Sequence, residues 1–262
     1  MQSGTTVNGL SGRQAREARF HDAMAAELDP GGMPPGPLDE WERALLDAAG
    51  DLAGKRVLEL GCGDGGLSLA LLERGASLTA LDVSPRMVAV ARARAERYRP
   101  AAPAARFIGA SAEDTGLGSG SFDLVVGKWI LHHLDLDRTA SEVRRLLVPG
   151  GRALFAESSA LNPALGWARR TLAGRFGVAS YGTPDERPLG RGDLDALAKR
   201  FASVRLEFPN FWLVQMLDRH LLRNRFPAVT GACRRADAYV ARRFPAARRY
   251  GYWLLLELRA GP

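Results

Sequence analysis

Residues 57–66 read VLELGCGDGG, and the rest of the chain is organised around this stretch. The apolar run VLEL is typical of a buried strand, and four glycines follow within six residues before the helical pattern LSLALLERG. A strand, a tight glycine turn and a helix N-terminus let the backbone approach a nucleotide-like ligand closely. The glycines fit both a GxGxG pattern and the dinucleotide pattern GxGxxG, so they leave the ligand open.

Two acidic residues accompany this turn. Glu59 lies inside the first strand, where a buried acid is costly without a cationic partner. Asp82 ends a second apolar strand, SLTALD, about twenty residues later, which is the usual distance for an acid that binds a ribose diol. The spacing of Asp82 therefore indicates a ligand that carries a ribose.

The chain at this point resembles the class I S-adenosylmethionine (SAM) dependent methyltransferases, in their small-molecule and lipid-modifying, type 11-like branch. The matching segments are VLELGCGDGG, LDVSPRMV, FIGASAEDTGLGSGSFDLVVGKWILHHL and EVRRLLVPGGRALFAE, which together cover roughly residues 55 to 157 in the family's order. The resemblance implies an α/β fold with a Rossmann-like, seven-stranded, mostly parallel sheet flanked by helices. It also implies an N-terminal helical cap, a C-terminal helical insertion and SAM as the cofactor.

The resemblance assigns the cofactor contacts to the carboxyl ends of the first four strands. In it, Gly61 and Gly63 admit the methionine part and the sugar against the backbone, and Asp82 holds the ribose hydroxyls. Glu59 either fixes the loop or reaches the amino group of the cofactor. The full predicted cofactor set is Glu59, Gly61, Cys62, Gly63, Asp82, Val83, Met87, Ser111, Ala112, Glu113 and Gly127.

One loop departs from the family's pattern. Many members have an acid where Ser111 stands, in the loop that flanks adenine. Ser111 can still form a hydrogen bond, but any charge in this loop must come from Glu113 or Asp114.

The candidate catalytic residues are His132, His133 and Glu157. Methyl transfer from SAM is an in-line displacement at an activated carbon, so the protein mainly aligns the acceptor and excludes water. An oxygen or nitrogen acceptor can also need a base, and histidine titrates near the operating pH. In the competing interpretation, LHHL is a packing unit between strand and helix. No spacing of ligand residues predicts a metal site.

The domain organisation follows from the same pattern. We expect residues 1–50 to form a tail and a helical cap, with residues 1–15 disordered. Residues 51–262 are expected to form the methyltransferase domain. Lid or insertion segments are expected at about residues 160–192 and 211–247, which are rich in aromatic residues and arginine.

The cap is predicted to contain two helices, over residues 14–28 and 38–52. In the resembling family such helices cover the cofactor and part of the acceptor pocket. Phe20, His21 and Trp41 are therefore candidates for lining it, although Phe20 and Trp41 could simply pin the helices to the domain.

The composition indicates what kind of protein this is and where it is expected to act. The 262 residues are 46% hydrophobic and 25% charged, which is typical of a globular chain with a real core. Cys62 and Cys233 form no disulfide framework, and no long uncharged apolar window or signal-peptide pattern occurs, so we expect a soluble, cytoplasmic protein. The net charge of +7 is compatible with an anionic acceptor or with peripheral contact to a membrane surface. The oligomeric state is left open.

We predict methyl transfer to a small or medium-sized, lipophilic metabolite, as in natural-product tailoring, with that metabolite as the partner and no nucleic acid. A base-modifying nucleic-acid enzyme is disfavoured because GKWI after the fourth strand lacks the Pro-Pro-aromatic signature. A nicotinamide-dependent oxidoreductase would not explain the later motifs, and the chain has no Tyr-x-x-x-Lys pair. A protein that binds SAM only structurally, without methylating, would have the same sequence pattern.

Overall fold

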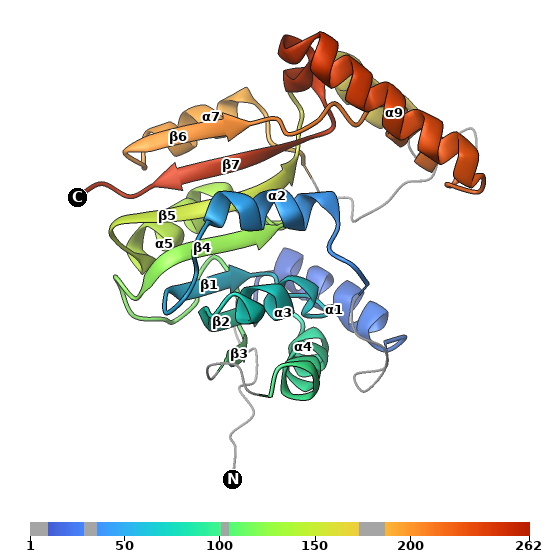
Figure 1. The fold of residues 1–262 in the computed structure, drawn as a ribbon. Coiled ribbons are helices and arrows are strands. Elements are labelled where there is room, and N and C mark those ends of the chain that lie inside the picture. The colour runs from blue at the N-terminus through green and yellow to red at the C-terminus, as the bar shows by residue number, and fades with distance from the viewer. Residues whose placement is uncertain (1–9, 29–35, 101–104, 173–186) are drawn as a thin grey trace.

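A seven-stranded sheet forms the centre of the molecule (Figure 1). It is seen in a computed structural model, which describes residues 10–28, 36–100, 105–172 and 187–262. The strand order is β3-β2-β1-β4-β5-β7-β6. The strands are β1 (Arg56–Leu60), β2 (Ser77–Asp82), β3 (Arg106–Gly109), β4 (Phe122–Lys128), β5 (Leu147–Ser158), β6 (Ser203–Glu207) and β7 (Trp253–Arg259).

The strand directions confirm the predicted mostly parallel sheet. β1 pairs in parallel with β2 on one side and β4 on the other, whereas β7 runs antiparallel to both β5 and β6. The chain moves outward from β1 to β3 and then returns to place β4 on the other side of β1. Ligands of open α/β sheets bind at such a reversal, beyond the carboxyl ends of the strands.

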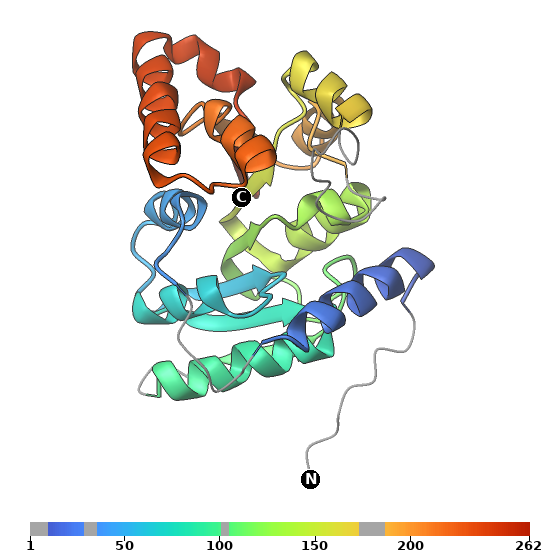
Figure 2. The same cartoon turned by 90° about the vertical axis from the view of Figure 1, so that its right-hand side faces the viewer.

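Helices cover both faces of the sheet because successive strand side chains alternate between them (Figure 2). Val57 joins the core formed with α2 (Glu40–Ala49), α3 (Gly66–Glu73) and α4 (Pro85–Tyr98). The next residue, Leu58, joins the opposite core, formed with α5 (Leu136–Leu146) and α7 (Arg191–Ala198). Because Glu59 follows Leu58, its carboxylate points to the side of the first core, at the end where β1 meets the glycine turn.

The N-terminal helix α1 (Gly12–Ala25) lies at the carboxyl end of the sheet, against α4 (Figure 1). It begins at Gly12 rather than at the predicted residue 14, because Ser11 caps it. The Ser11 side chain accepts from the Gln14 N–H, and the Gln14 side chain accepts from the Ser11 N–H at 2.8 Å. The predicted disorder was therefore wrong for residues 12–15. Residues 1–9 lie outside the described residues.

The C-terminal helices form a lobe beyond the sheet edge, which we call the C-terminal lobe, residues 208–252 (Figures 1 and 2). It comprises α8 (Val214–Leu217), the single π-helical turn η2 (Asp218–Leu222), α9 (Pro227–Arg243) and the 3-10 helix η3 (Pro245–Tyr250). A further helix, α6 (Pro163–Leu172), follows β5, and residues 173–186 of the predicted lid lie outside the described residues. Among the described helices, none has the length and apolar character that a bilayer crossing requires.

An aromatic cluster joins the cap to this lobe. The ring of Trp41 in α2 lies 4.4 Å from that of Trp129, 5.1 Å from Trp212 and 4.3 Å from Trp253, between ring centroids. Trp41 is therefore a core residue that pins α2 to the domain, which was the second of the two roles considered for it. Trp129 follows β4 with a φ of 56°, a left-handed conformation that costs a bulky side chain energy and is held here by its packing.

Candidate active site

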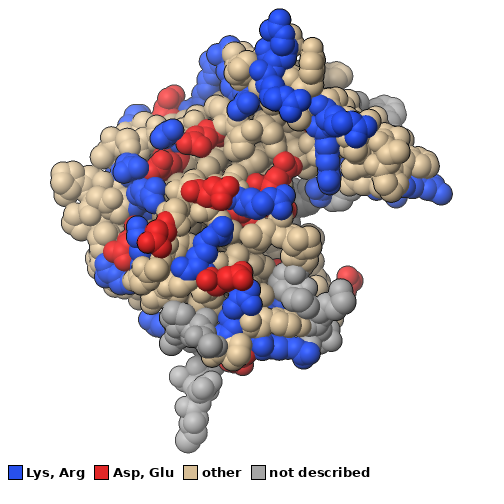
Figure 3. Space-filling model, in the orientation of Figure 1, with Lys and Arg blue, Asp and Glu red and all other residues tan. Residues whose placement is uncertain are grey.

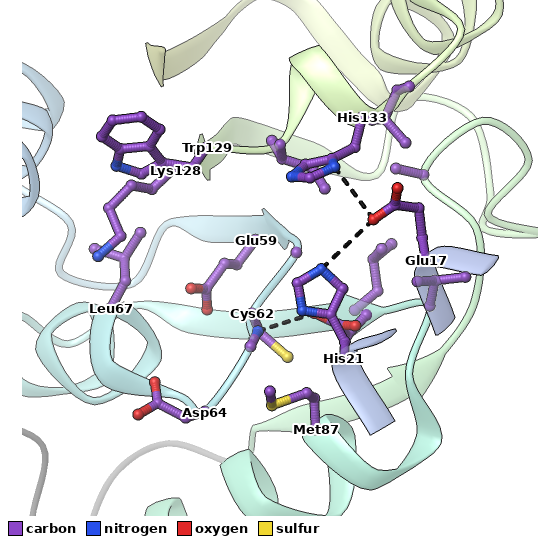
Figure 4. Close-up of a pocket in the computed structure, with 18 of the residues that line it drawn as sticks. Glu17, His21, Glu59, Cys62, Asp64, Leu67, Met87, Lys128, Trp129 and His133 are labelled. Carbon is purple, nitrogen blue, oxygen red and sulfur yellow. Dashed lines mark hydrogen bonds and ion pairs between the residues drawn. The ribbon is translucent and has the colours of Figure 1, made fainter. Parts of the chain in front are cut away.

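A cavity of about 410 Å³ opens at the carboxyl ends of β1, β2 and β4, beside α1 (Figure 4). Its volume lies within the usual range for small-molecule sites. Most of the predicted cofactor residues line it. They are Glu59, Gly61, Cys62, Gly63, Asp82, Val83, Met87, Ser111 and Ala112.

Three of the four glycines, Gly61, Gly63 and Gly65, are required in the turn for different reasons. All three have positive φ values, of 70° at Gly61, 50° at Gly63 and 87° at Gly65. A Cβ at Gly61 would lie 2.8 Å from Cδ1 of Ile130, and one at Gly65 would lie 2.9 Å from the Cα of Ala91 in α4. A Cβ at Gly63 would meet no atom within 4 Å. Gly63 therefore leaves free space at the cavity wall, whereas the other two make room for the protein's own packing.

Asp82 ties the glycine turn to the end of β2. Its buried carboxylate accepts from the Gly63 N–H at 2.9 Å and from the Ser84 N–H at 2.8 Å. Burial raises the pKa of Asp82, and the two backbone donors oppose that shift. A carboxylate has about four lone-pair sites, so two remain for a ligand in the cavity.

Glu59 is a fully buried acid on the same wall. Its Oε2 accepts from the Ser68 hydroxyl in α3 at 2.5 Å. Burial raises the pKa of Glu59 to about 8, against the lowering effects of Ser68 and of the Lys128 ammonium. The carboxyl group is therefore mostly protonated at neutral pH.

This pKa makes stability depend on pH. In the unfolded chain Glu59 titrates near 4.5, so its contribution to the free energy of unfolding is complete below pH 4.5 and is lost as the pH rises toward 8. The substitution Glu59→Gln keeps the shape of the side chain but removes its ability to ionise. We expect it to raise the midpoint of thermal unfolding at pH 9 by about 5 °C and to change it little at pH 5. Thermal melts of the ligand-free protein at both pH values measure this.

The matched control is Glu73→Gln, at the exposed end of α3, which should leave the melting temperature unchanged at both pH values. An equal gain at pH 5 and pH 9 would mean that Glu59 titrates normally.

The opposite wall holds Glu17 and His21 from α1, and His133 from the 3-10 turn η1 (Leu131–His133) after β4. Both imidazoles point toward the Glu17 carboxylate (Figure 4). Glu17 Oε2 lies 3.2 Å from His133 Nδ1 and 3.8 Å from His21 Nε2. Burial, followed by the adjacent His132, lowers the pKa of His133 to about 4, so this imidazole is neutral at pH 7.

A neutral imidazole beside a carboxylate can accept a proton, because the carboxylate stabilises the imidazolium that forms. The ligand atoms of Glu17, His21 and His133 also lie within 4.8 Å of one another, a set that could hold a divalent cation. Sequence reasoning missed Glu17. The available signal was its i, i+4 spacing from His21, which puts both side chains on one face of a helix.

His132 and Glu157 lie behind this wall. His132 lines a separate cavity of about 180 Å³ together with Arg13, Arg187 and Asp193. Its Nδ1 lies 2.7 Å from Glu157 Oε2, while Glu157 Oε1 accepts from the N–H groups of Ile130 and Leu131. The pair therefore holds the turn that presents His133.

Two predicted cofactor residues also lie outside the cavity lining. Glu113 binds Arg13, accepts from Gln14 Nε2 at 3.0 Å and accepts from the Asp135 N–H at 2.9 Å, so it fastens α1 to the domain. Gly127 is required by packing, since a Cβ there would lie 2.7 Å from Ile130 Cγ2.

Lys128 was also missed, although it lines the cavity. Its ammonium binds Glu42 at 2.5 Å and Asp39 at 3.3 Å at the start of α2, which ties the cap to β4.

The described residues around Gly63 and Asp82 fit the ribose of SAM. The gap at Gly63 is a space that a Cβ would fill, and the adjacent buried carboxylate of Asp82 offers acceptor positions for two hydroxyls. The apolar side chains of Leu67, Met87 and Trp129 line the same cavity. Glu59 supplies an acid that could face a ligand amino group.

Comparison with known proteins agrees with this geometry. Residues 58–155 match the family described as a methyltransferase domain. The chain is 36% identical over 120 residues, 45% of its length, to a demethylmenaquinone methyltransferase of Thermus thermophilus, of which it covers 53%. It spans about half the length of the curated relatives that it matches.

Solved structures share the fold over nearly the whole chain. A geranyl diphosphate C-methyltransferase from Streptomyces coelicolor has 18% identity and a TM-score of 0.58, with 96% of this chain and 98% of that chain covered. A protein described for the conversion of a disulfide bond into a thioacetal group during echinomycin biosynthesis has 23% identity and a TM-score of 0.57, with 93% of each chain covered.

Proposed function

Since this chain belongs to the class I SAM-dependent methyltransferases through its domain at residues 58–155, we propose that it transfers a methyl group from SAM to a small or medium-sized, lipophilic metabolite. One observation carries the proposal. The glycine turn and Asp82 lie on one wall of a single cavity, and the neutral imidazole of His133 lies on the opposite wall. A cofactor-binding side and a proton-accepting side thus face the same space.

Most of the protein's contribution is to position the cofactor and exclude water. When bound, SAM supplies a methyl group on a positively charged sulfur. Asp82 would hold the ribose hydroxyls, the backbone at Gly63 would lie against the ligand, and Glu59 would face the amino group. Met24 and Leu28, near the C-terminal end of α1, add apolar lining that favours a lipophilic acceptor.

His133 would take the proton of an oxygen or nitrogen acceptor. The Glu17 carboxylate beside Nδ1 favours the tautomer with a proton on Nδ1, which leaves the lone pair of Nε2 to accept. His132 and Glu157 would act through the turn that they hold. They are positioning residues in this proposal.

Natural-product tailoring is the proposed context. Two proteins of similar fold support this setting. One is described for a step of echinomycin biosynthesis, and the other is a geranyl diphosphate C-methyltransferase. The particular acceptor is left to a screen.

The test begins with binding. Melting temperatures of the folded protein are measured against rising SAM, S-adenosylhomocysteine and NADH, because a ligand selective for the native state raises stability by mass action. We expect saturable shifts with the first two ligands and none with NADH. Methyl transfer from labelled SAM to a panel of lipophilic alcohols, phenols and amines then identifies the acceptor.

Other outcomes have defined meanings. Folded protein that responds to neither SAM nor S-adenosylhomocysteine would overturn the proposal. Tight binding without transfer to any acceptor of the panel would favour a structural use of SAM.

A further inference from the structure

The positive charge of the chain is concentrated in the C-terminal lobe, residues 208–252. This segment has nine arginines, no lysine and two aspartates, so its net charge is +7. That value equals the net charge of the whole chain. The remaining residues are therefore neutral overall, and the net positive charge that attracts an anionic partner at long range lies in this lobe.

Both acids of the lobe are buried and serve its folding. Asp237 accepts from the N–H groups of Leu213, Val214 and Gln215, and so caps the start of α8. Asp218 accepts from the Thr230 hydroxyl at 2.6 Å. The exposed side chains of residues 208–252 consequently include arginines and no acid. Figure 3 shows arginines gathered over this lobe, at the top of the view.

Large apolar side chains are exposed among these arginines at the turn between η2 and α9. Every residue from Leu221 to Val229 is exposed. Leu221 is 62% and Phe226 is 50% exposed, and Leu217, Leu222 and Val229 accompany them. We call residues 217–229 the tip. At its centre, Arg223 and Asn224 have left-handed φ values of 54° and 55°, which reverse the chain and present the neighbouring side chains outward.

We propose that the tip binds the surface of an anionic phospholipid membrane. Leucine and phenylalanine can enter the boundary between head groups and acyl chains, while arginine binds lipid phosphates through its planar fork of donors. Charge complementarity favours anionic over neutral lipid. A nucleic acid would pair with the arginines but would leave the exposed leucines and Phe226 in water. The proposal does not depend on methyl transfer.

The experiment is flotation with vesicles of phosphatidylcholine alone and of phosphatidylcholine mixed with phosphatidylglycerol, at low and physiological salt. We expect the full chain to float with the anionic vesicles only, and less so as salt rises. One variant combines Arg223→Gln with Arg225→Gln, and a second combines Leu221→Ser with Phe226→Ser. Each variant should lower the partition coefficient between vesicles and water about tenfold or more.

The control replaces Arg205 and Arg259, exposed arginines of β6 and β7, with glutamine, and should float like the original chain. Circular dichroism and the S-adenosylhomocysteine thermal shift show whether each variant is folded, independently of lipid binding. Failure of the original chain to float, or unchanged flotation of both tip variants, would overturn the proposal.

Two further results would replace it. Tighter binding to an oligonucleotide than to vesicles, lost only in the arginine variant, would make the lobe a nucleic-acid surface. Dimerisation abolished by the apolar variant, without flotation of the original chain, would make the tip a contact between two copies.

Discussion

Replacement of Asp82 by alanine is expected to weaken the binding of SAM and S-adenosylhomocysteine about 100-fold or more, because two charge-assisted hydrogen bonds to ribose hydroxyls would be lost. Calorimetric titration with S-adenosylhomocysteine measures this. The same change removes the acceptor for the N–H groups of Gly63 and Ser84. We therefore also expect the ligand-free protein to melt roughly 5–10 °C lower, since buried unpaired donors are costly.

Two further variants separate the effects on binding and on stability. Asp82→Asn retains one acceptor oxygen and should give smaller losses of both. Asp123→Asn, at the opposite end of the sheet, weakens the ion pair with Arg56 and should leave cofactor affinity unchanged. Wild-type affinity in Asp82→Ala would remove the ribose assignment.

Replacement of His133 by alanine is expected to lower kcat about 100-fold at saturating SAM, while the dissociation constant for S-adenosylhomocysteine changes less than about threefold. A positioned general base typically contributes a rate factor of about 100 or more. The low pKa of His133, about 4, means that the wild-type base remains available as the pH falls below 6, until protonation near pH 4 removes it. The activity profile of wild type and variant against pH, with the acceptor found by the screen, checks both statements.

The controls address the neighbouring residues. His133→Asn keeps a donor near the position of Nδ1 without Nε2, and should be as slow as the alanine variant. His132→Ala should mainly lower the melting temperature, because it breaks the contact with Glu157. A chelator that slowed the wild type as much as His133→Ala does would instead mean that Glu17, His21 and His133 hold a required cation.

The sheet and the placement of the glycine turn beside Asp82 could be predicted because their signals are local. The run VLELGCGDGG contains its own strand, turn and helix start, and the spacing to Asp82 follows from one strand, helix and strand unit. Apolar runs such as DLVVG, RALFA and WLLLEL then indicate most of the remaining strands. The reasons for individual glycines were not local, however. A Cβ at Gly61 would collide with Ile130, and a Cβ at Gly65 would collide with Ala91. Both of these residues belong to later segments of the chain.

The side of the cavity that Glu17, His21 and His133 form could be predicted only in part, because it forms between segments more than a hundred residues apart. His21 and His133 were candidates, and Glu17 was not. His132 and His133 are adjacent in sequence, and only the 3-10 geometry of residues 131–133 determines which one faces the cavity. Glu17 belongs to a helix whose position depends on contacts of Gln14 and Arg13 with Glu113. The burial of Asp218 and Asp237, which leaves the lobe uniformly basic outside, likewise depends on tertiary packing.

The way in which α1 is attached has a consequence for kinetics. Its contacts with the domain are largely polar, through Gln14 with Ser111 and Glu113, and through Asp22 with Ser84. Polar groups regain water when a helix separates, so such a helix can leave at lower cost than one held by a large apolar face. Because α1 forms part of the cavity wall, we expect its departure to gate exchange of the spent cofactor. The lifetime of the covered state would then determine how fast the spent cofactor leaves.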